Sequence, residues 1–102
     1  MIHVIYRWQI VPGTESEFCA WWHEGTQSIR REQRGSLGSV LLRPHGTTST
    51  FVGVARWQTK EAVEAFWKSA ESRSNPYGDL VAVEILDEID DLDVKVSVPS
   101  DP

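Results

Sequence analysis

The stretch of sequence that decides the fold is Phe51-Val-Gly-Val-Ala-Arg-Trp57, which runs directly into Gln58-Thr-Lys-Glu-Ala-Val-Glu-Ala-Phe-Trp67. The first part alternates as strand residues do, so one strand face carries Phe51, Gly53, Ala55 and Trp57. The second part has helical spacing, and Thr59 can cap its start. The stretch therefore predicts a strand-to-helix junction with Trp57 at its mouth.

Gly53 lies in the interior of this predicted strand, close to the small residue Ala55. A glycine inside a strand weakens it and often marks the close approach of another group. Gly53 is therefore either an accommodation for a neighbouring side chain or the floor of a ligand pocket, and the sequence leaves both interpretations open.

The residues before this stretch predict a strand, a helix and a second strand. Residues 2–11 alternate as a strand with apolar groups on both faces, and Pro12-Gly13 ends it. Thr14 and Glu17 have the form of a capping box, which predicts a helix from about residue 15 to residue 33. Its buried stripe is expected to contain Phe18, Trp21, Trp22, Gly25 and Ile29, with His23 off that stripe. Residues 35–43 predict a second strand, joined by a hairpin to the strand that ends at Trp57.

The residues after the stretch complete the pattern. The inward face of the second helix is expected to carry Val63, Phe66, Trp67 and Ala70. Residues 80–86 predict a fourth strand and residues 92–98 a short fifth one. We expect a single domain over residues 1–98 and a frayed tail at 99–102.

The order β-α-β-β-α-β, with a short extra C-terminal strand, predicts an α+β, ferredoxin-like fold with an antiparallel sheet. Two helices can cover only one side of the sheet, and the other side is predicted to carry Ile5, Val11, Val52 and Val54. We therefore expect a homodimer packed sheet to sheet, to which the tail strand could contribute. A monomer with a partly wetted sheet is the alternative, because the same face carries His3, Arg7, Gln9 and Arg56.

Composition restricts the classes of partner. The 102 residues include five Trp, three Phe and two Tyr, a heavy aromatic load that must be buried. A formal charge of −5 argues against binding to nucleic acid or to an anionic membrane. The N-terminus has no signal-peptide pattern, and no apolar run approaches the roughly 20 residues of a membrane-spanning helix. Cys19 has no companion for an internal disulfide, so we expect a cytoplasmic protein.

The sequence gives no support for a metal or nucleotide site. His3, His23 and His45 lack the spacing and the neighbouring ligands that a metal centre needs. No glycine-rich nucleotide fingerprint or phosphate loop is present. We therefore predict neither a metal nor a cofactor.

Three segments resemble the antibiotic biosynthesis monooxygenase family of dimeric α+β barrels: Pro12-Gly-Thr-Glu-Ser-Glu-Phe18, Gly35-Ser-Leu-Gly-Ser-Val-Leu-Leu-Arg43 and Arg56-Trp-Gln-Thr-Lys-Glu-Ala-Val63. The resemblance covers most of residues 2–86. It implies a pocket between the sheet and the helices of one subunit, with Trp57 as the pocket tryptophan. Family members oxidise polycyclic phenols or quinols with molecular oxygen, often without metal or flavin, while others bind or degrade haem.

The chain departs from two patterns within that family. Haem-degrading relatives have an asparagine on the first strand and a histidine on or after the second helix, whereas this chain has Tyr6 and no histidine beyond His45. Some cofactor-free oxygenases have an asparagine before the tryptophan and a tyrosine after it, where this chain has Gly53 and Val63.

We predict a site in which Trp57, Tyr6 and His23 are catalytic and the substrate contacts Trp8, Trp22, Gly53 and Phe66. Tyr6 can donate a hydrogen bond or shuttle a proton, Trp57 offers an indole N–H and a stacking surface, and His23 has a suitable ordinary pKa if the helix turns it inward. For each aromatic residue, ordinary core packing is the alternative. The predicted function is a cofactor-independent monooxygenase for a small aromatic phenol or quinol. A non-catalytic dimeric ligand-binding protein and a haem-binding or haem-degrading protein are the alternatives.

Overall fold

The structure, a computed structural model, describes residues 1–69 and 75–92. The elements follow the order β1 (Ile2–Ile10), α1 (Glu15–Glu32), β2 (Ser36–Leu42), β3 (Thr50–Trp57), α2 (Lys60–Trp67) and β4 (Gly78–Asp87). All strand pairs are antiparallel and form one sheet in the order β2-β3-β1-β4. The predicted ferredoxin-like α+β fold is therefore confirmed. Ala70, the predicted tail at 99–102 and all but Leu92 of the predicted fifth strand lie outside the described residues.

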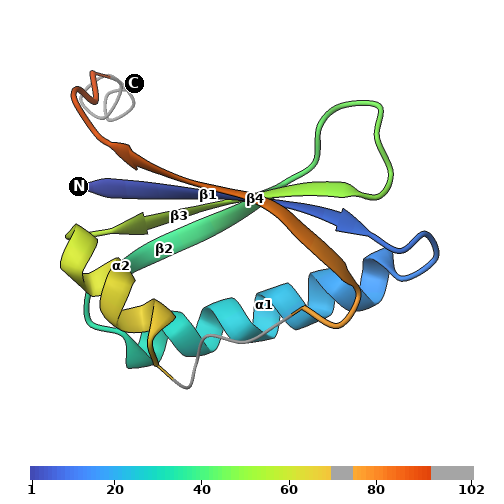
Figure 1. The fold of residues 1–102 in the computed structure, drawn as a ribbon, viewed down its shortest axis with the longest axis horizontal. Coiled ribbons are helices and arrows are strands. Elements are labelled where there is room, and N and C mark those ends of the chain that lie inside the picture. The colour runs from blue at the N-terminus through green and yellow to red at the C-terminus, as the bar shows by residue number, and fades with distance from the viewer. Residues whose placement is uncertain (70–74, 93–102) are drawn as a thin grey trace, which may run out of the picture.

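Both helices lie on the same side of the sheet (Figure 1). The central strand β1 shows why, because its buried residues Ile2, Val4, Trp8 and Ile10 all fall on one face. Strand β3 repeats the pattern with Phe51, Gly53, Ala55 and Trp57 buried. Alternation along a strand sends the intervening residues to the opposite face. The helices consequently cover the face that the sequence marks as apolar on both central strands.

The core on the helical side consists of two separate clusters. One contains Ile2, Val4, Ala55, Trp57, Val63 and Phe66, and the other contains Trp8, Ile10, Phe18 and Phe51. Tyr6 packs against both clusters. The middle of the helical side, around Tyr6, therefore lies between two packed regions and is not filled by either.

The start of α1 differs from the capping box predicted from Thr14 and Glu17. Thr14 is the N-cap residue, but its hydroxyl donates to the carbonyl of Val11 at 2.7 Å and makes no cap hydrogen bond. Gly13, with φ +97°, forms the turn that brings these two groups together. The Glu15 carboxylate accepts from the Gly13 N–H instead, at 2.9 Å. The prediction was wrong because a turn competed for the threonine hydroxyl.

The cap predicted for α2 is confirmed. The Thr59 side chain accepts a hydrogen bond from the N–H of Ala62 at 3.2 Å. Val63 and Phe66 are buried as expected, whereas Trp67 is 36 % exposed. The inward face of α2 is thus narrower than predicted, and Trp67 lies at its margin.

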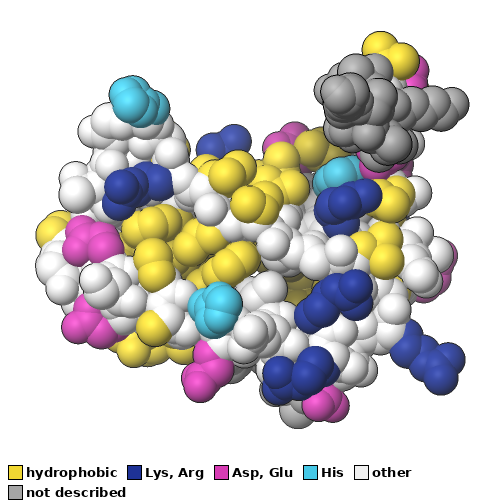
Figure 2. Space-filling view, turned by 180° about the vertical axis from the view of Figure 1, so that it is seen from behind, with side chains coloured by type: hydrophobic (Ala, Val, Ile, Leu, Met, Phe, Trp, Pro, Cys, Tyr) yellow, Lys and Arg dark blue, Asp and Glu magenta, His cyan; other side chains and the backbone are white. Residues whose placement is uncertain are grey.

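The sheet face opposite the helices carries apolar side chains that no described residue covers. Val40, Leu42 and Leu86 are exposed there, and the register places Ile5, Val52 and Val54 on the same face. Arg7 and Arg56 are also exposed on it. Figure 2 views the molecule from behind and along the sheet, and it shows hydrophobic side chains at the surface in a group that runs from the upper, sheet side toward the helical side.

Candidate functional site

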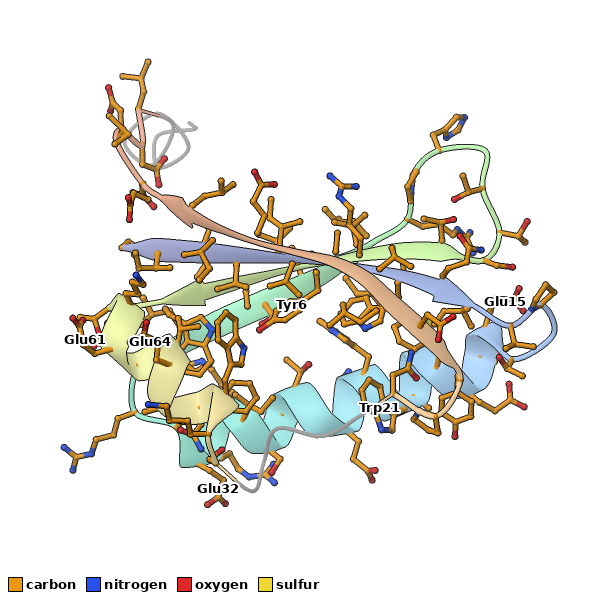
Figure 3. The ribbon with its side chains drawn as sticks, viewed as in Figure 1. Tyr6, Glu15, Trp21, Glu32, Glu61 and Glu64 are labelled. Atoms are coloured by element: carbon orange, nitrogen blue, oxygen red, sulfur yellow. The ribbon has the colours of Figure 1, made fainter. Side chains whose placement is uncertain are left out.

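A cavity of about 890 Å³ lies between the helical side of the sheet and the two helices. The sheet contributes Tyr6, Trp8, Gly53 and Trp57, and the helices contribute Trp22 and Phe66. Tyr6 points from the sheet toward the helical layer, where Trp21 stands on α1 (Figure 3). Asp79 and Leu80 of β4 also line the cavity and are exposed, so the cavity meets solvent along that strand. Its volume is in the range of small-molecule sites.

Six of the seven predicted site residues line this cavity: Tyr6, Trp8, Trp22, Gly53, Trp57 and Phe66. His23 does not. It is exposed on α1 and lines a separate depression together with Cys19 and Tyr77. The position of His23 off the apolar stripe indicates an outward side chain, and the structure shows the side chain exposed, so α1 does not turn it inward.

Tyr6 has a hydroxyl whose environment is well defined. The indole N–H of Trp67 donates to the Tyr6 hydroxyl oxygen at 3.0 Å. Burial raises the pKa of Tyr6 above its ordinary value, and the hydrogen bond from Trp67 acts in the opposite direction. The phenol is therefore neutral at physiological pH and retains its proton for donation. Its ring stacks on Trp8, with centroids 5.7 Å apart and planes at 14°.

Trp57 forms a buried wall of the cavity, because only 2 % of its surface is exposed. Its rings stack on Phe66 of α2, with centroids 5.4 Å apart and planes at 29°. The stack joins the last residue of β3 to the helix that follows it. Trp57 therefore lies where the sequence predicted, at the junction of strand and helix, and one part of it faces the cavity.

The ring of Trp8 lies close against Gly53. A Cβ atom built on Gly53 would lie 2.8 Å and 2.9 Å from two ring carbons of Trp8, and 3.5 Å from Nε1 of Trp22. Carbon atoms do not approach so closely without a shift, so the Trp8 ring needs a residue without a side chain. Of the two interpretations of this glycine, packing is the one that the contacts support, although Gly53 also lines the cavity.

Sequence reasoning missed Asn75, which also lines the cavity. Its side-chain oxygen accepts a hydrogen bond from the backbone N–H of Tyr77 at 2.9 Å. Because that donor requires an oxygen, the amide orientation is fixed and Nδ2 points the other way. Nδ2 is buried and makes no hydrogen bond to any described residue. In the sequence Asn75 is a polar residue before a proline, as turns commonly contain, and no sequence signal marks its side chain as part of a cavity.

The cavity lining has little charge. Among the described lining residues, Asp79 is the only one that carries a charge, and none is Lys, Arg or His. The described part of the chain also contains no group of three or more His, Cys, Asp or Glu that could hold a metal ion. With so little charge, the lining suits an uncharged aromatic ligand better than one with several carboxylates.

No described helix is long and apolar enough to cross a membrane.

These features define a ferredoxin-like α+β domain with an aromatic cavity beneath its helices. The family model described as "Antibiotic biosynthesis monooxygenase" matches residues 1–74, and the chain belongs to this family. No curated protein matches the sequence.

Solved structures confirm the fold. A crystal structure of an antibiotic biosynthesis monooxygenase superposes with a TM-score of 0.73 at 17% identity, covering 88% of this chain and 100% of that one. The cofactor-independent oxygenase SnoaB from Streptomyces nogalater superposes with a TM-score of 0.75 at 16% identity, covering 89% and 95%. The haem degrader MhuD from Mycobacterium tuberculosis superposes with a TM-score of 0.73 at 20% identity, covering 90% and 99%. At these identities the likeness establishes the architecture and not the substrate.

Proposed function

We propose that this chain is a cofactor-independent monooxygenase that oxidises a small aromatic phenol or quinol with molecular oxygen. The observation that carries the proposal is the aromatic cavity with the neutral Tyr6 hydroxyl directed into the space between sheet and helices. Membership of a family described as monooxygenases supports it. Six of the residues proposed to form the site line that one cavity.

The proposed oxidation balances in atoms and electrons without an added reductant. A phenol and one oxygen molecule give a quinone and one water, so one oxygen atom enters the ring and the substrate supplies all the electrons. The phenolate is the form that reduces oxygen, and a hydrogen bond from Tyr6 to its oxygen stabilises that anion. Trp57 and Phe66 supply one stacked wall, and Trp8 and Trp22 supply another surface. A flat aromatic ring is the ligand that such walls favour.

Tyr6 acts as a donor in this scheme and not as a base, since its raised pKa keeps the proton on the phenol. The substrate therefore ionises by its own acidity, helped by the hydrogen bond that its anion receives. His23 has no role in the scheme, because it is exposed outside the cavity.

The proposal includes a homodimer formed through the open face of the sheet. Val40, Leu42 and Leu86 are 47 %, 48 % and 38 % exposed there, and an apolar face of this kind favours a partner. A second copy packed about a two-fold axis covers it with the same residues. We expect Leu42→Lys to produce monomers in sedimentation, whereas Glu61→Lys, at an exposed residue of α2 on the other side of the sheet, leaves the dimer intact. A wild-type monomer at micromolar concentration would contradict this part of the proposal.

A second candidate function is a protein that binds an aromatic ligand without converting it. The observation that favours it is the absence, among the described lining residues, of a histidine or another group that takes up a proton near neutral pH. Haem binding has less support, because the described lining offers no histidine for the iron and no cation for the propionates.

Oxygen consumption distinguishes these functions. The purified protein is incubated with a panel of hydroquinones and naphthols, and ¹⁸O₂ identifies the atom transferred to the product. We expect Tyr6→Phe to lower kcat by about 100- to 1,000-fold, since it removes a donor to the developing anion. Tyr77→Phe is the control, because Tyr77 lines the other depression. Retained binding without oxygen uptake supports the second candidate, and a Soret band with haemin supports the third.

A further inference from the structure

We infer that Trp67 is a positioning residue that commits the Tyr6 hydroxyl to donation, so that the cavity selects aromatic ligands presenting an acceptor oxygen. Phenolates, aryl ketones and quinones belong to this class, whereas plain aromatic hydrocarbons do not. The inference rests on the proposed function because it concerns the same cavity, but binding measurements test it without turnover.

The direction of the hydrogen bond between the two side chains is unambiguous. An indole nitrogen can only donate, so Trp67 Nε1, 3.0 Å away, uses an acceptor position on the Tyr6 oxygen. The remaining capacity of the hydroxyl includes its own O–H donor. No described residue accepts that proton in a hydrogen bond, and both side chains line the cavity. A ligand oxygen in the cavity is the acceptor that this arrangement lacks.

The two residues come from elements that are distant in sequence. Tyr6 lies in the middle of β1, and its ring is held by the stack on Trp8. Trp67 is the last residue of α2. With both ring systems anchored on regular elements, the hydroxyl has a restricted set of orientations, and the bond from Trp67 selects among them. Selection of the ligand therefore depends on a residue that does not itself contact the ligand oxygen.

Asn75, which also lines the cavity, carries a second hydrogen-bond donor. Its Nδ2 is a buried donor without a partner among the described residues, while its oxygen is occupied by the Tyr77 N–H. Leaving such a donor unsatisfied is unfavourable. Because Nδ2 itself is buried, a ligand reaches it only if the Asn75 side chain shifts, so the Tyr6 hydroxyl is the donor on which the inference rests.

The test compares two ligands of nearly the same shape, 1-tetralone, which carries a carbonyl oxygen, and tetralin, which carries none. Isothermal titration calorimetry gives Kd values for the wild type and for Trp67→Phe, which keeps a flat ring and removes the N–H. We expect Trp67→Phe to weaken 1-tetralone binding by about 3- to 10-fold, the effect of one hydrogen bond, and to leave tetralin unchanged. Tyr6→Phe gives the same selective loss, and adding Trp67→Phe to it causes no further loss.

A titration of Tyr6 provides an independent readout that a purely structural role of Trp67 does not move. In a Tyr77→Phe background, Tyr6 is the remaining tyrosine and its ionisation is followed by absorbance near 295 nm. Because the hydrogen bond from Trp67 lowers the pKa of Tyr6, its removal should raise that pKa further. Circular dichroism checks that each variant is folded.

The outcomes separate this inference from the proposed function. If Trp67→Phe weakens both ligands equally, or leaves the Tyr6 titration unchanged, the positioning role is refuted while oxygen uptake can still be observed. If the wild type binds neither ligand, both the inference and the aromatic cavity site are refuted. A selective loss of 1-tetralone binding together with a raised Tyr6 pKa supports the inference even where no hydroquinone is oxidised.

Discussion

Replacing Gly53 with alanine tests how tightly the cavity wall is packed. The added Cβ would lie 2.8 Å and 2.9 Å from two carbons of the Trp8 ring, which is 7 % exposed and packs against the rings of Tyr6 and Phe18. Overpacking of this kind costs about 1–3 kcal/mol. Replacing a strand glycine returns about 0.5–1 kcal/mol through the reduced entropy of the unfolded chain. We therefore expect a net loss of about 0–2.5 kcal/mol in the free energy of unfolding.

Urea denaturation of Gly53→Ala measures this loss, and a double-mutant cycle with Trp8→Phe assigns it. The two close atoms belong to the six-membered part of the indole, which phenylalanine does not extend to the same place. In the Trp8→Phe background, Gly53→Ala should therefore be neutral or stabilising. A coupling free energy of about 1–3 kcal/mol is expected, as for residues in direct contact. An equal cost of Gly53→Ala in both backgrounds would refute the assignment of this glycine to packing.

Two further expectations concern stability. Thr59→Ala removes the side chain that accepts from the Ala62 N–H and should cost about 1 kcal/mol, which thermal or urea unfolding measures. Glu88→Gln should lose stability at neutral pH because His3 Nε2 lies 2.8 Å from Glu88 Oε1 and this hydrogen bond lowers the pKa of Glu88. A carboxylate with a lowered pKa stabilises the fold above its unfolded pKa, and the benefit is lost as pH falls through the folded pKa. The difference between wild type and Glu88→Gln should accordingly shrink as the pH falls below the ordinary carboxyl value of 4.5 and through the lowered pKa of Glu88, and a pH-independent difference would contradict this.

The fold could be predicted from the sequence because apolar residues repeat at the spacing of a strand or of a helix. Alternation in β1 and β3 and helical spacing in α1 and α2 depend on neighbours along the chain, and the structure reproduces them. The capping box failed because Thr14 had two partners within reach, and the choice depended on the turn at Gly13. Local patterns identify the donors and acceptors of a turn but do not decide among them.

The site could be predicted in part for a related reason. The alternation of side chains along β1 and β3 predicts that Tyr6 and Trp57 lie on the helical face of the sheet. Both residues line the same cavity on that face. The places of Trp67 and Asn75 at the cavity depend instead on single atoms: an indole nitrogen 3.0 Å from a hydroxyl, and a buried amide nitrogen without a partner among the described residues. A helical wheel gives the angle of a residue but not the atom that it meets on another element. Such residues become visible only once both elements are placed.

The cavity lining consists of stacked aromatic rings and of hydrogen-bond donors, and the two kinds of group would select ligands in different ways. The stacked pairs Tyr6–Trp8 and Trp57–Phe66 belong to different core clusters, so the cavity lies between two walls that are each packed from behind. Large rings with few rotatable bonds hold their positions at low entropic cost, and they favour any flat apolar ligand. They cannot distinguish a hydrocarbon from a ketone of the same shape. That distinction depends on the Tyr6 O–H donor, because a ligand without an acceptor leaves this donor desolvated and without a partner. Selection by polarity is then stronger than selection by shape in a site of this kind.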